Sequence, residues 1–171
     1  STTTTACMDD AKHPLSSGEE RWQTVIEECE SLVAEYEDDG WAVTSPVPGD
    51  VVPVPAPGDS EVSKVGLDVL LSGAEFEQVE SMVEESDFDE FEAYTGQEGG
   101  MVYASVLFKS TDSRRVFCLP LYYQTVDAGR MLERVRSGEQ FHVYVHPLSA
   151  DAQVQFGVED PRPLFPPEDL A

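Results

Sequence analysis

The segment from Ser17 to Gly40 constrains the fold more than any other part of the chain. Its apolar residues recur at i, i+3, i+4 and i+7, which is the spacing of one face of an α-helix. They are Trp22, Val25, Ile26, Cys29, Leu32, Val33 and Tyr36. Ser17 and Glu20 have the spacing of a capping box, and Gly40 suits a helix C-terminus. We therefore predict an amphipathic helix over residues 18–40 that buries one face against the rest of the protein.

The segments on either side of this helix lack a helical pattern. Residues 1–17 have no periodicity, and we expect a flexible tail there. Residues 41–62 begin with a possible short strand and then alternate valine with proline, which is typical of polyproline II. Such a segment suits a ligand for an SH3-like domain or a stiff spacer. We favour the spacer, which would connect the helix to the main body of the protein.

Residues 63–158 contain a regular succession of strands and helices. Alternating or continuous apolar runs predict strands at 65–71, 88–95, 101–109, 114–123, 141–146 and 152–158. Two helices are expected at 72–85, with a capping box from Ser72 to Glu75, and at 125–138. Pro120 places its strand at a sheet edge or a bulge. The order β-α-β-β-β-α-β-β predicts an α+β core with one mostly antiparallel sheet and helices on a face.

The C-terminal residues 159–171 are rich in proline, and we expect an extended tail. Leu164 and Phe165 are its apolar residues nearest the core, and they are candidate anchors. The chain is thus divided into a tail (1–17), a helix (18–40), a connector (41–62), a core (63–158) and a second tail (159–171).

The charge of the chain excludes several function classes. There are 34 acidic and 10 basic residues among 171, a formal net charge of −24. Such a surface repels phosphate groups, so we expect no binding to nucleic acids or to membranes. At low salt this charge destabilises the compact state, whereas molar salt shortens the Debye length to about 3 Å and screens the repulsion. We therefore interpret the chain as a protein of a salt-filled cytoplasm, in preference to an ordinary acidic protein or a nucleic-acid mimic.

The number and spacing of the cysteines and the lack of a long apolar stretch also predict a cytoplasmic protein. No stretch of 18 apolar residues is present to span a membrane. Cys7, Cys29 and Cys118 are an odd number without CxxC spacing, which argues against a disulfide framework and against structural zinc. Cys29 and Cys118 fall in apolar patterns, and we interpret them as small core residues. No base lies near Cys118 in the sequence, so a thiol nucleophile is disfavoured.

Histidine and tyrosine side chains form one candidate binding surface. His142, Tyr144 and His146 alternate with Val143 and Val145, so we expect them on one face of a strand. Two histidines four residues apart in a strand are about 13 Å from each other, too far to share one metal. A metal would need further ligands such as His13 or Asp151, and we predict neither a metal nor another cofactor.

Arginines form a second candidate surface. Residues 101–171 hold seven of the ten basic residues. Arg114 and Arg115 lie at a predicted turn, and Arg130 and Arg134 share one helix face. Ion pairs to Glu133 or Glu139 and the helix dipole explain part of this pattern. The alternative is a site for an anionic ligand, an acidic partner or a second copy of the chain.

Other motifs carry no clear chemistry. The acidic run of Asp87, Asp89, Glu90 and Glu92 lacks the residue pattern of a calcium loop. The chain has no phosphate-binding loop and no GxSxG nucleophile motif. No catalytic residue is therefore predicted.

Four segments and the proline-rich end form a pattern that is similar to that of a known family. The segments are GLDVLLSGAEF, EGGMVYASVLF, LPLYYQTVDAGRMLE and HVYVHPLS. With this pattern, residues 18–167 resemble a family of small, acidic, uncharacterised proteins from haloarchaea. The resemblance implies a halophilic cytoplasmic origin and brings no activity and no functional residue with it.

Two hypotheses about function follow from these patterns. The first is a non-enzymatic binding or regulatory module that acts through a protein partner or by self-association. The alternative is a small enzyme or ligand-binding protein with a pocket near Tyr122, Tyr123, His142 and His146. An enclosed apolar pocket with converging polar groups favours the second, and a flat open sheet face favours the first.

Overall fold

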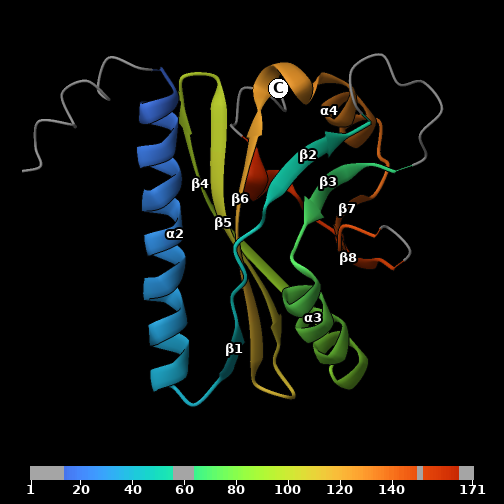
Figure 1. Cartoon of the computed structure of the whole chain (residues 1–171). Coiled ribbons are helices and arrows are strands. Elements are labelled where there is room, and N and C mark those ends of the chain that lie inside the picture. The colour runs from blue at the N-terminus through green and yellow to red at the C-terminus, as the bar shows by residue number, and fades with distance from the viewer. Residues whose placement is uncertain (1–13, 56–63, 150–151, 166–171) are drawn as a thin grey trace, which may run out of the picture.

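The protein consists of two four-stranded β-sheets with helices outside them (Figure 1). The computed structural model describes residues 14–55, 64–149 and 152–165. The predicted α+β class is confirmed. The strands divide between two mixed sheets instead of forming one, because two segments pair in parallel with strands far away in the sequence.

The first sheet, sheet A, contains a meander of three long antiparallel strands. These are β4 (Glu90–Glu98), β5 (Met101–Ser110) and β6 (Arg115–Gln124), and β1 (Ala42–Thr44) lies parallel to β6 on its other side. The strand β1 pairs with residues 115–117, and within the described residues the remainder of β6 has no paired strand on that side. Pro120 lies in this part of β6, which agrees with the predicted edge position.

The second sheet, sheet B, has the order β2-β3-β7-β8. Its strands are β2 (Asp50–Val54), β3 (Gly66–Leu70), β7 (Phe141–His146) and β8 (Val154–Val158). The central pair, β3 and β7, is parallel, and both outer pairs are antiparallel. At the start of β3, Gly66 has a φ of 148°, and a Cβ there would lie 1.7 Å from the His142 carbonyl oxygen. Only glycine permits this close approach of the two strands.

The prediction that residues 41–62 act only as a spacer is wrong for β2. This strand pairs with β3, and both Val51 and Pro53 are buried. The alternation of valine and proline matches the period of a strand as well as that of polyproline II. Proline is tolerated because β2 is an edge strand and needs to donate hydrogen bonds on one side only. Residues 56–62 of the predicted connector lie outside the described residues.

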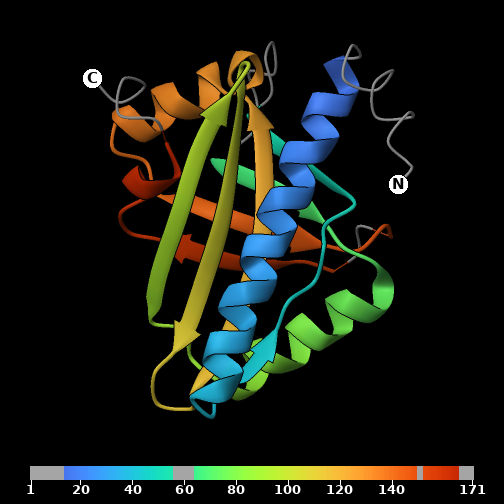
Figure 2. The same cartoon turned by 90° about the vertical axis from the view of Figure 1, so that its left-hand side faces the viewer.

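The long helix α2 (Pro14–Asp38) covers the outer face of sheet A (Figure 2). Its apolar face packs on β5 and β6, where Cys29, Leu107, Val116 and Cys118 form a buried cluster. The helix begins before the predicted start at residue 18, so the predicted tail is too long. Pro14 suits a first helical position because the amide hydrogen that proline lacks has no partner there. Residues 1–13 lie outside the described residues.

The two shorter helices lie near the ends of sheet B. The helix α3 (Gly73–Glu85) begins at the predicted capping box, in which Ser72 and Glu75 each bond to the other's backbone. The helix α4 (Gly129–Arg136) is shorter than predicted and follows a 3₁₀ turn, η1 (Thr125–Asp127). Thr125 does not cap a helix, because its hydroxyl donates to the carbonyl oxygen of Gly100.

The main core lies between the inner faces of the two sheets. Phe156 of sheet B stacks on Phe108 of sheet A, with ring centroids 4.5 Å apart. The C-terminal segment closes one end of this core through a short 3₁₀ helix, η2 (Arg162–Leu164). The predicted anchors are confirmed, since Leu164 and Phe165 are 1% and 4% exposed. Residues 159–165 therefore belong to the folded body, and residues 166–171 lie outside the described part.

Candidate functional site

The outer face of sheet B presents a row of polar side chains. In Figure 1, α2 lies against sheet A, away from sheet B, while α3 and α4 lie below and above sheet B. Val143 and Val145 of β7 point into the core, so His142, Tyr144 and His146 point outward, as predicted. Their role in binding stays a prediction.

Asp68 joins this row from the neighbouring strand β3. The parallel register sets Asp68 opposite Tyr144 and Leu70 opposite His146, so Asp68 lies diagonally across from His146. The His146 Nε2 atom is 3.2 Å from Asp68 Oδ2, and its Nδ1 atom is 2.9 Å from the Pro147 carbonyl oxygen. The other carboxylate oxygen, Oδ1, is buried with no hydrogen-bond partner among the described residues. Our sequence reasoning missed Asp68 because nothing local shows that β3 pairs with β7.

Tyr144 is the buried centre of the row and is 4% exposed. Its hydroxyl accepts a hydrogen bond from the Val65 amide at 3.2 Å and lies 3.5 Å from His142 Nδ1. Lys64 Nζ lies 5.0 Å from the centre of the Tyr144 ring and donates to Gln153 Oε1 at 2.8 Å. Burial raises the pKa of Tyr144, and so does the nearby charge of Asp68. The phenol therefore remains neutral and acts as a packed hydrogen-bonding group.

The pocket expected near Tyr122, Tyr123, His142 and His146 is not assembled. Tyr122 lies under α2 on the outer face of sheet A, where it contacts Trp22 edge to face at 4.8 Å. Tyr123 points into the core and donates to the Leu164 carbonyl oxygen at 3.2 Å. The two histidines lie on the opposite side of the protein, on the outer face of sheet B.

The predicted arginine surface is also divided. Arg114 and Arg115 lie at the start of β6, whereas Arg130 and Arg134 lie in α4, beyond the end of that strand. Ten strand residues span about 33 Å, so the two pairs do not approach each other. At the start of β6, Arg115 pairs with Glu85 at 2.7 Å.

Two further arginine contacts favour a structural role. Arg134 Nη2 donates to Glu139 Oε1 at 2.7 Å, which is one of the ion pairs expected from the sequence. The guanidinium of Arg114 bonds to the Asp39 carbonyl oxygen and lies 5.7 Å from the Trp41 ring centre. These contacts join α2 and the C-terminus of α4 to adjacent segments.

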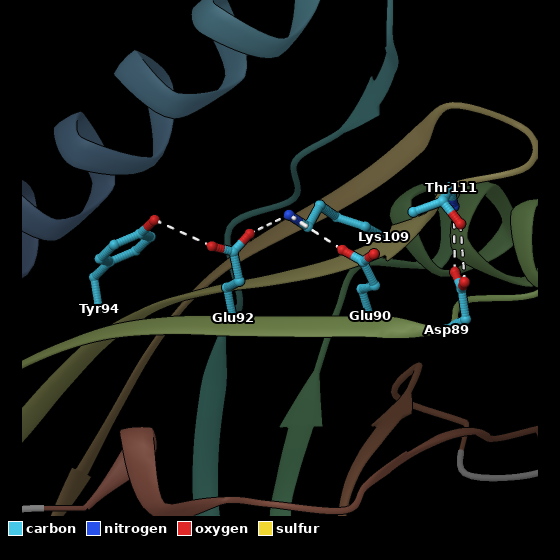
Figure 3. A network of polar contacts seen from close by, with 6 residues as sticks. All are labelled: Asp89, Glu90, Glu92, Tyr94, Lys109 and Thr111. Atoms are coloured by element: carbon cyan, nitrogen blue, oxygen red, sulfur yellow. Dashed lines mark hydrogen bonds and ion pairs between the residues drawn. The ribbon is translucent and has the colours of Figure 1, made fainter.

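Three residues of the acidic run, Asp89, Glu90 and Glu92, form a network along the β4 edge of sheet A (Figure 3). Lys109 forms ion pairs with Glu92 and, at 3.6 Å, with Glu90. Although burial opposes its charge, the hydrogen bond from Lys109 to Glu92 raises the pKa of this lysine. Asp89 accepts hydrogen bonds from the Thr111 hydroxyl at 2.9 Å and the Thr111 amide at 3.2 Å, which lower its pKa. The carboxylates of Asp89, Glu90 and Glu92 therefore bind β4 to β5.

Hollows in the described part of the protein are open grooves between elements. One of 690 Å³ lies between β1 and α3, and one of 510 Å³ lies between the start of β4 and the end of β8. Neither is lined by His142, Tyr144 or His146. Within the described residues, no three histidine, cysteine or carboxylate side chains gather as ligands for a metal ion. No helix in the described ranges has the length and apolarity needed to cross a membrane.

Comparison with known proteins identifies the family of this chain but assigns no activity to it. The model of a family of unknown function, DUF7529, matches residues 8–166. The chain belongs to this family. The match includes α2, both sheets and the C-terminal anchors, so the whole described fold lies within the family's extent. The searches of curated proteins and of solved structures gave no match.

Proposed function

We propose that the protein is a non-enzymatic binding module that recognises a protein partner through the outer face of sheet B. This surface comprises Val52, Asp68, Leu70, His142, Tyr144, His146 and Gln155. Among the described residues no helix lies across this face, whereas the corresponding face of sheet A is covered by α2. Val52 is 39% exposed on this face, and Leu70, His142 and His146 are partly exposed, a mixture of apolar and polar groups that suits an interaction surface.

The distribution of charge is the observation that carries this proposal. The helix α2 has eight acidic residues and one basic residue, and α3 has five acidic residues and no basic one. The four strands of sheet B together have two acidic residues, Asp50 and Asp68, and no lysine or arginine. The centres of protein interfaces are depleted in charge and enriched in aromatic residues. A charge-poor face on so acidic a protein suits contact with another protein.

The alternative of a small enzyme has less support from the geometry. Both ring nitrogens of His146 face oxygen atoms, so this ring accepts a proton from a substrate only by breaking one of those contacts. Tyr144 is buried, and its hydroxyl is engaged by the Val65 amide. The tyrosines that would complete the expected pocket lie elsewhere in the fold.

We further propose that this binding takes place in the cytoplasm of a halophilic archaeon. The net charge of −24 and the presence of only three lysines among ten basic residues support this setting. Where salt screens charges, association depends on apolar and hydrogen-bonding contacts more than on ion pairs. The outer face of sheet B offers contacts of this kind.

Site-directed photocrosslinking tests the proposed surface. A photoreactive amino acid is placed at Val52 or Gln155 on sheet B, and at Glu30 or Glu77 on the outer sides of α2 and α3. All four positions are exposed. After irradiation in high-salt cells, we expect one discrete crosslinked protein from the two sheet B positions and none from the helix positions.

Two further measurements make the result decisive. The variant Gln155→Glu with Val52→Glu adds charge to the face and should abolish crosslinking from a probe placed at Leu70. Crosslinking of equal strength from Glu30 or Glu77 would refute the proposed surface. A crosslinked product with twice the mass of the chain, together with a dimer in sedimentation, would replace the protein partner with a second copy.

A further inference from the structure

Ser105 of β5 carries a buried hydroxyl that has no hydrogen-bond partner among the described residues. The residue is 1% exposed, and its Oγ atom forms no hydrogen bond in the described part of the chain. The nearby Cys29 thiol is a weak hydrogen-bonding group, and no bond of ordinary geometry joins it to this hydroxyl. Because burying an unpaired hydroxyl costs free energy, its retention at this position suggests that a ligand completes the hydrogen bond.

A groove of 290 Å³ between α2 and β4 has Ser105 at its floor. The helix α2 packs on β5 and β6 and crosses them obliquely, so β4 lies beside the helix and not beneath it (Figure 2). Six residues line the groove: Glu28, Ser31, Leu32, Glu35, Tyr94 and Ser105. Ser105 is the buried residue of this set, Leu32 is half-buried, and the other four are exposed at the rim. The volume lies near the lower end of the range for small-molecule pockets, about 300–1,000 Å³.

Regular elements set the two sides of this groove. Glu28, Leu32 and Glu35 follow the i, i+4, i+7 spacing of one stripe on α2. The antiparallel register of β4 and β5 places Tyr94 directly opposite Ser105, on the same face of the sheet. Tyr94 is 53% exposed, and its hydroxyl donates to Glu92 at 3.4 Å (Figure 3). The Tyr94 and Leu32 side chains therefore form apolar walls above the Ser105 hydroxyl.

The lining residues select for positive charge at the rim of the groove. Glu28 and Glu35 are its charged residues, and no lysine or arginine lines it. Neither carboxylate forms an ion pair within the described part of the chain. Such a rim repels phosphate and carboxylate groups and attracts a cation. The groove thus offers a negative rim, apolar walls and one hydroxyl at the floor.

We propose that this groove binds a small organic amine that has an apolar body and a hydroxyl group at the end opposite its ammonium. The ammonium faces Glu28 and Glu35, the apolar body contacts Leu32 and Tyr94, and the ligand's hydroxyl pairs with Ser105, which can both donate and accept. Since Tyr94 stands opposite Ser105 and is exposed, rotation of its side chain opens the floor to the ligand. The site is separate from the outer face of sheet B, so it does not depend on the proposed function.

Titration with tyramine, followed by the backbone amide signals of the isotope-labelled full chain in molar KCl, tests this site. Tyramine has a phenol hydroxyl at one end and an ammonium at the other. We expect saturable shifts at Leu32, Tyr94 and Ser105, and none at Asp68 or His146 on sheet B. Phenethylamine lacks the hydroxyl, and tyrosol carries a hydroxyl in place of the ammonium. Both should bind more weakly than tyramine.

Three variants assign the contacts of the probe. Ser105→Ala should weaken tyramine binding about two- to tenfold, the effect of one hydrogen bond, and leave phenethylamine binding unchanged. Its melting temperature should be no lower than that of the parent, because the change removes an unpaired buried hydroxyl. Glu28→Gln combined with Glu35→Gln should weaken binding of both amines and leave tyrosol unaffected. Glu30→Gln is the matched control, since Glu30 is exposed on α2 and does not line the groove.

Several results would overturn the proposal. One is the absence of saturable shifts at the groove residues when tyramine reaches its solubility limit. Another is equal affinity of Ser105→Ala and the parent protein for tyramine, or tyrosol that binds as tightly as tyramine. A lower melting temperature of Ser105→Ala would show that the hydroxyl serves the fold and not a ligand. The first of these results is read on the parent protein, so it does not depend on how the variants fold.

Discussion

The C-terminal anchor gives a quantitative test of the fold, through the substitution Phe165→Ala. Phe165 is 4% exposed, and its ring packs edge to face on Phe141 with centroids 5.6 Å apart. The preceding residue, Leu164, is 1% exposed, and its carbonyl oxygen accepts a hydrogen bond from Tyr123. These contacts place the last described residues inside the main core.

The magnitude of the effect follows from burial. Truncation of a buried phenylalanine to alanine removes its transfer free energy and leaves a cavity, at a cost of about 3–5 kcal/mol. Leu164→Ala should cost about 2–5 kcal/mol for the same reason. A domain of this kind has a free energy of unfolding of about 5–15 kcal/mol. Loss of both side chains should therefore remove most of the stability of the protein.

Urea unfolding in molar KCl, followed by circular dichroism, measures these changes. Leu148→Ala is the matched control because Leu148 is 84% exposed, and it should change the free energy of unfolding by less than about 0.5 kcal/mol. If Phe165→Ala lowers the free energy of unfolding by no more than Leu148→Ala, the C-terminal segment is not packed and the reasoning is refuted.

Three other predictions concern salt, the proline segment and acid. The melting temperature should rise from low to molar KCl, since the net charge of −24 opposes folding when it is unscreened; a constant value would contradict a halophilic protein. Val51→Asp should lower the urea midpoint far more than Val52→Asp, because Val51 is buried and Val52 is 39% exposed; equal effects would mean that β2 does not pack. The contacts with Thr111 hold the pKa of Asp89 below its ordinary value of 3.8, so the ionised carboxylate stabilises the fold at pH values above 3.8. This stabilisation is lost as the pH falls through the lowered pKa. Thr111→Val should therefore reduce the acid-induced loss of melting temperature relative to the parent protein, and an unchanged pH profile would show that this contact contributes nothing.

Local patterns in the sequence were sufficient for the elements whose cause is local. The spacing of apolar residues identified α2, and the Ser72–Glu75 capping box marked the start of α3. The three long strands of sheet A were recognised because short turns connect them in order. Leu164 and Phe165 were recognised as anchors because they are apolar residues in an otherwise polar, proline-rich segment.

The strand β2 could not be predicted from its local sequence because of its prolines. An alternation of valine and proline is compatible with a free polyproline segment and with an edge strand. Only the pairing with β3 and the burial of Val51 distinguish them. The start of α2 was misplaced for a similar reason, since both Ser17 and Pro14 are suitable helix-start residues.

The candidate sites depended on contacts between distant segments. The parallel pairing of β3 with β7 sets Asp68 beside His146, and the packing of α2 on sheet A places Leu32 and Ser105 along one groove. The sequence alone determined which residues share one face of a helix or strand, because that depends on the fixed geometry of each element. Tertiary structure decided which faces meet, because many pairings satisfy the same local patterns and the choice depends on burying all the apolar faces together in one core.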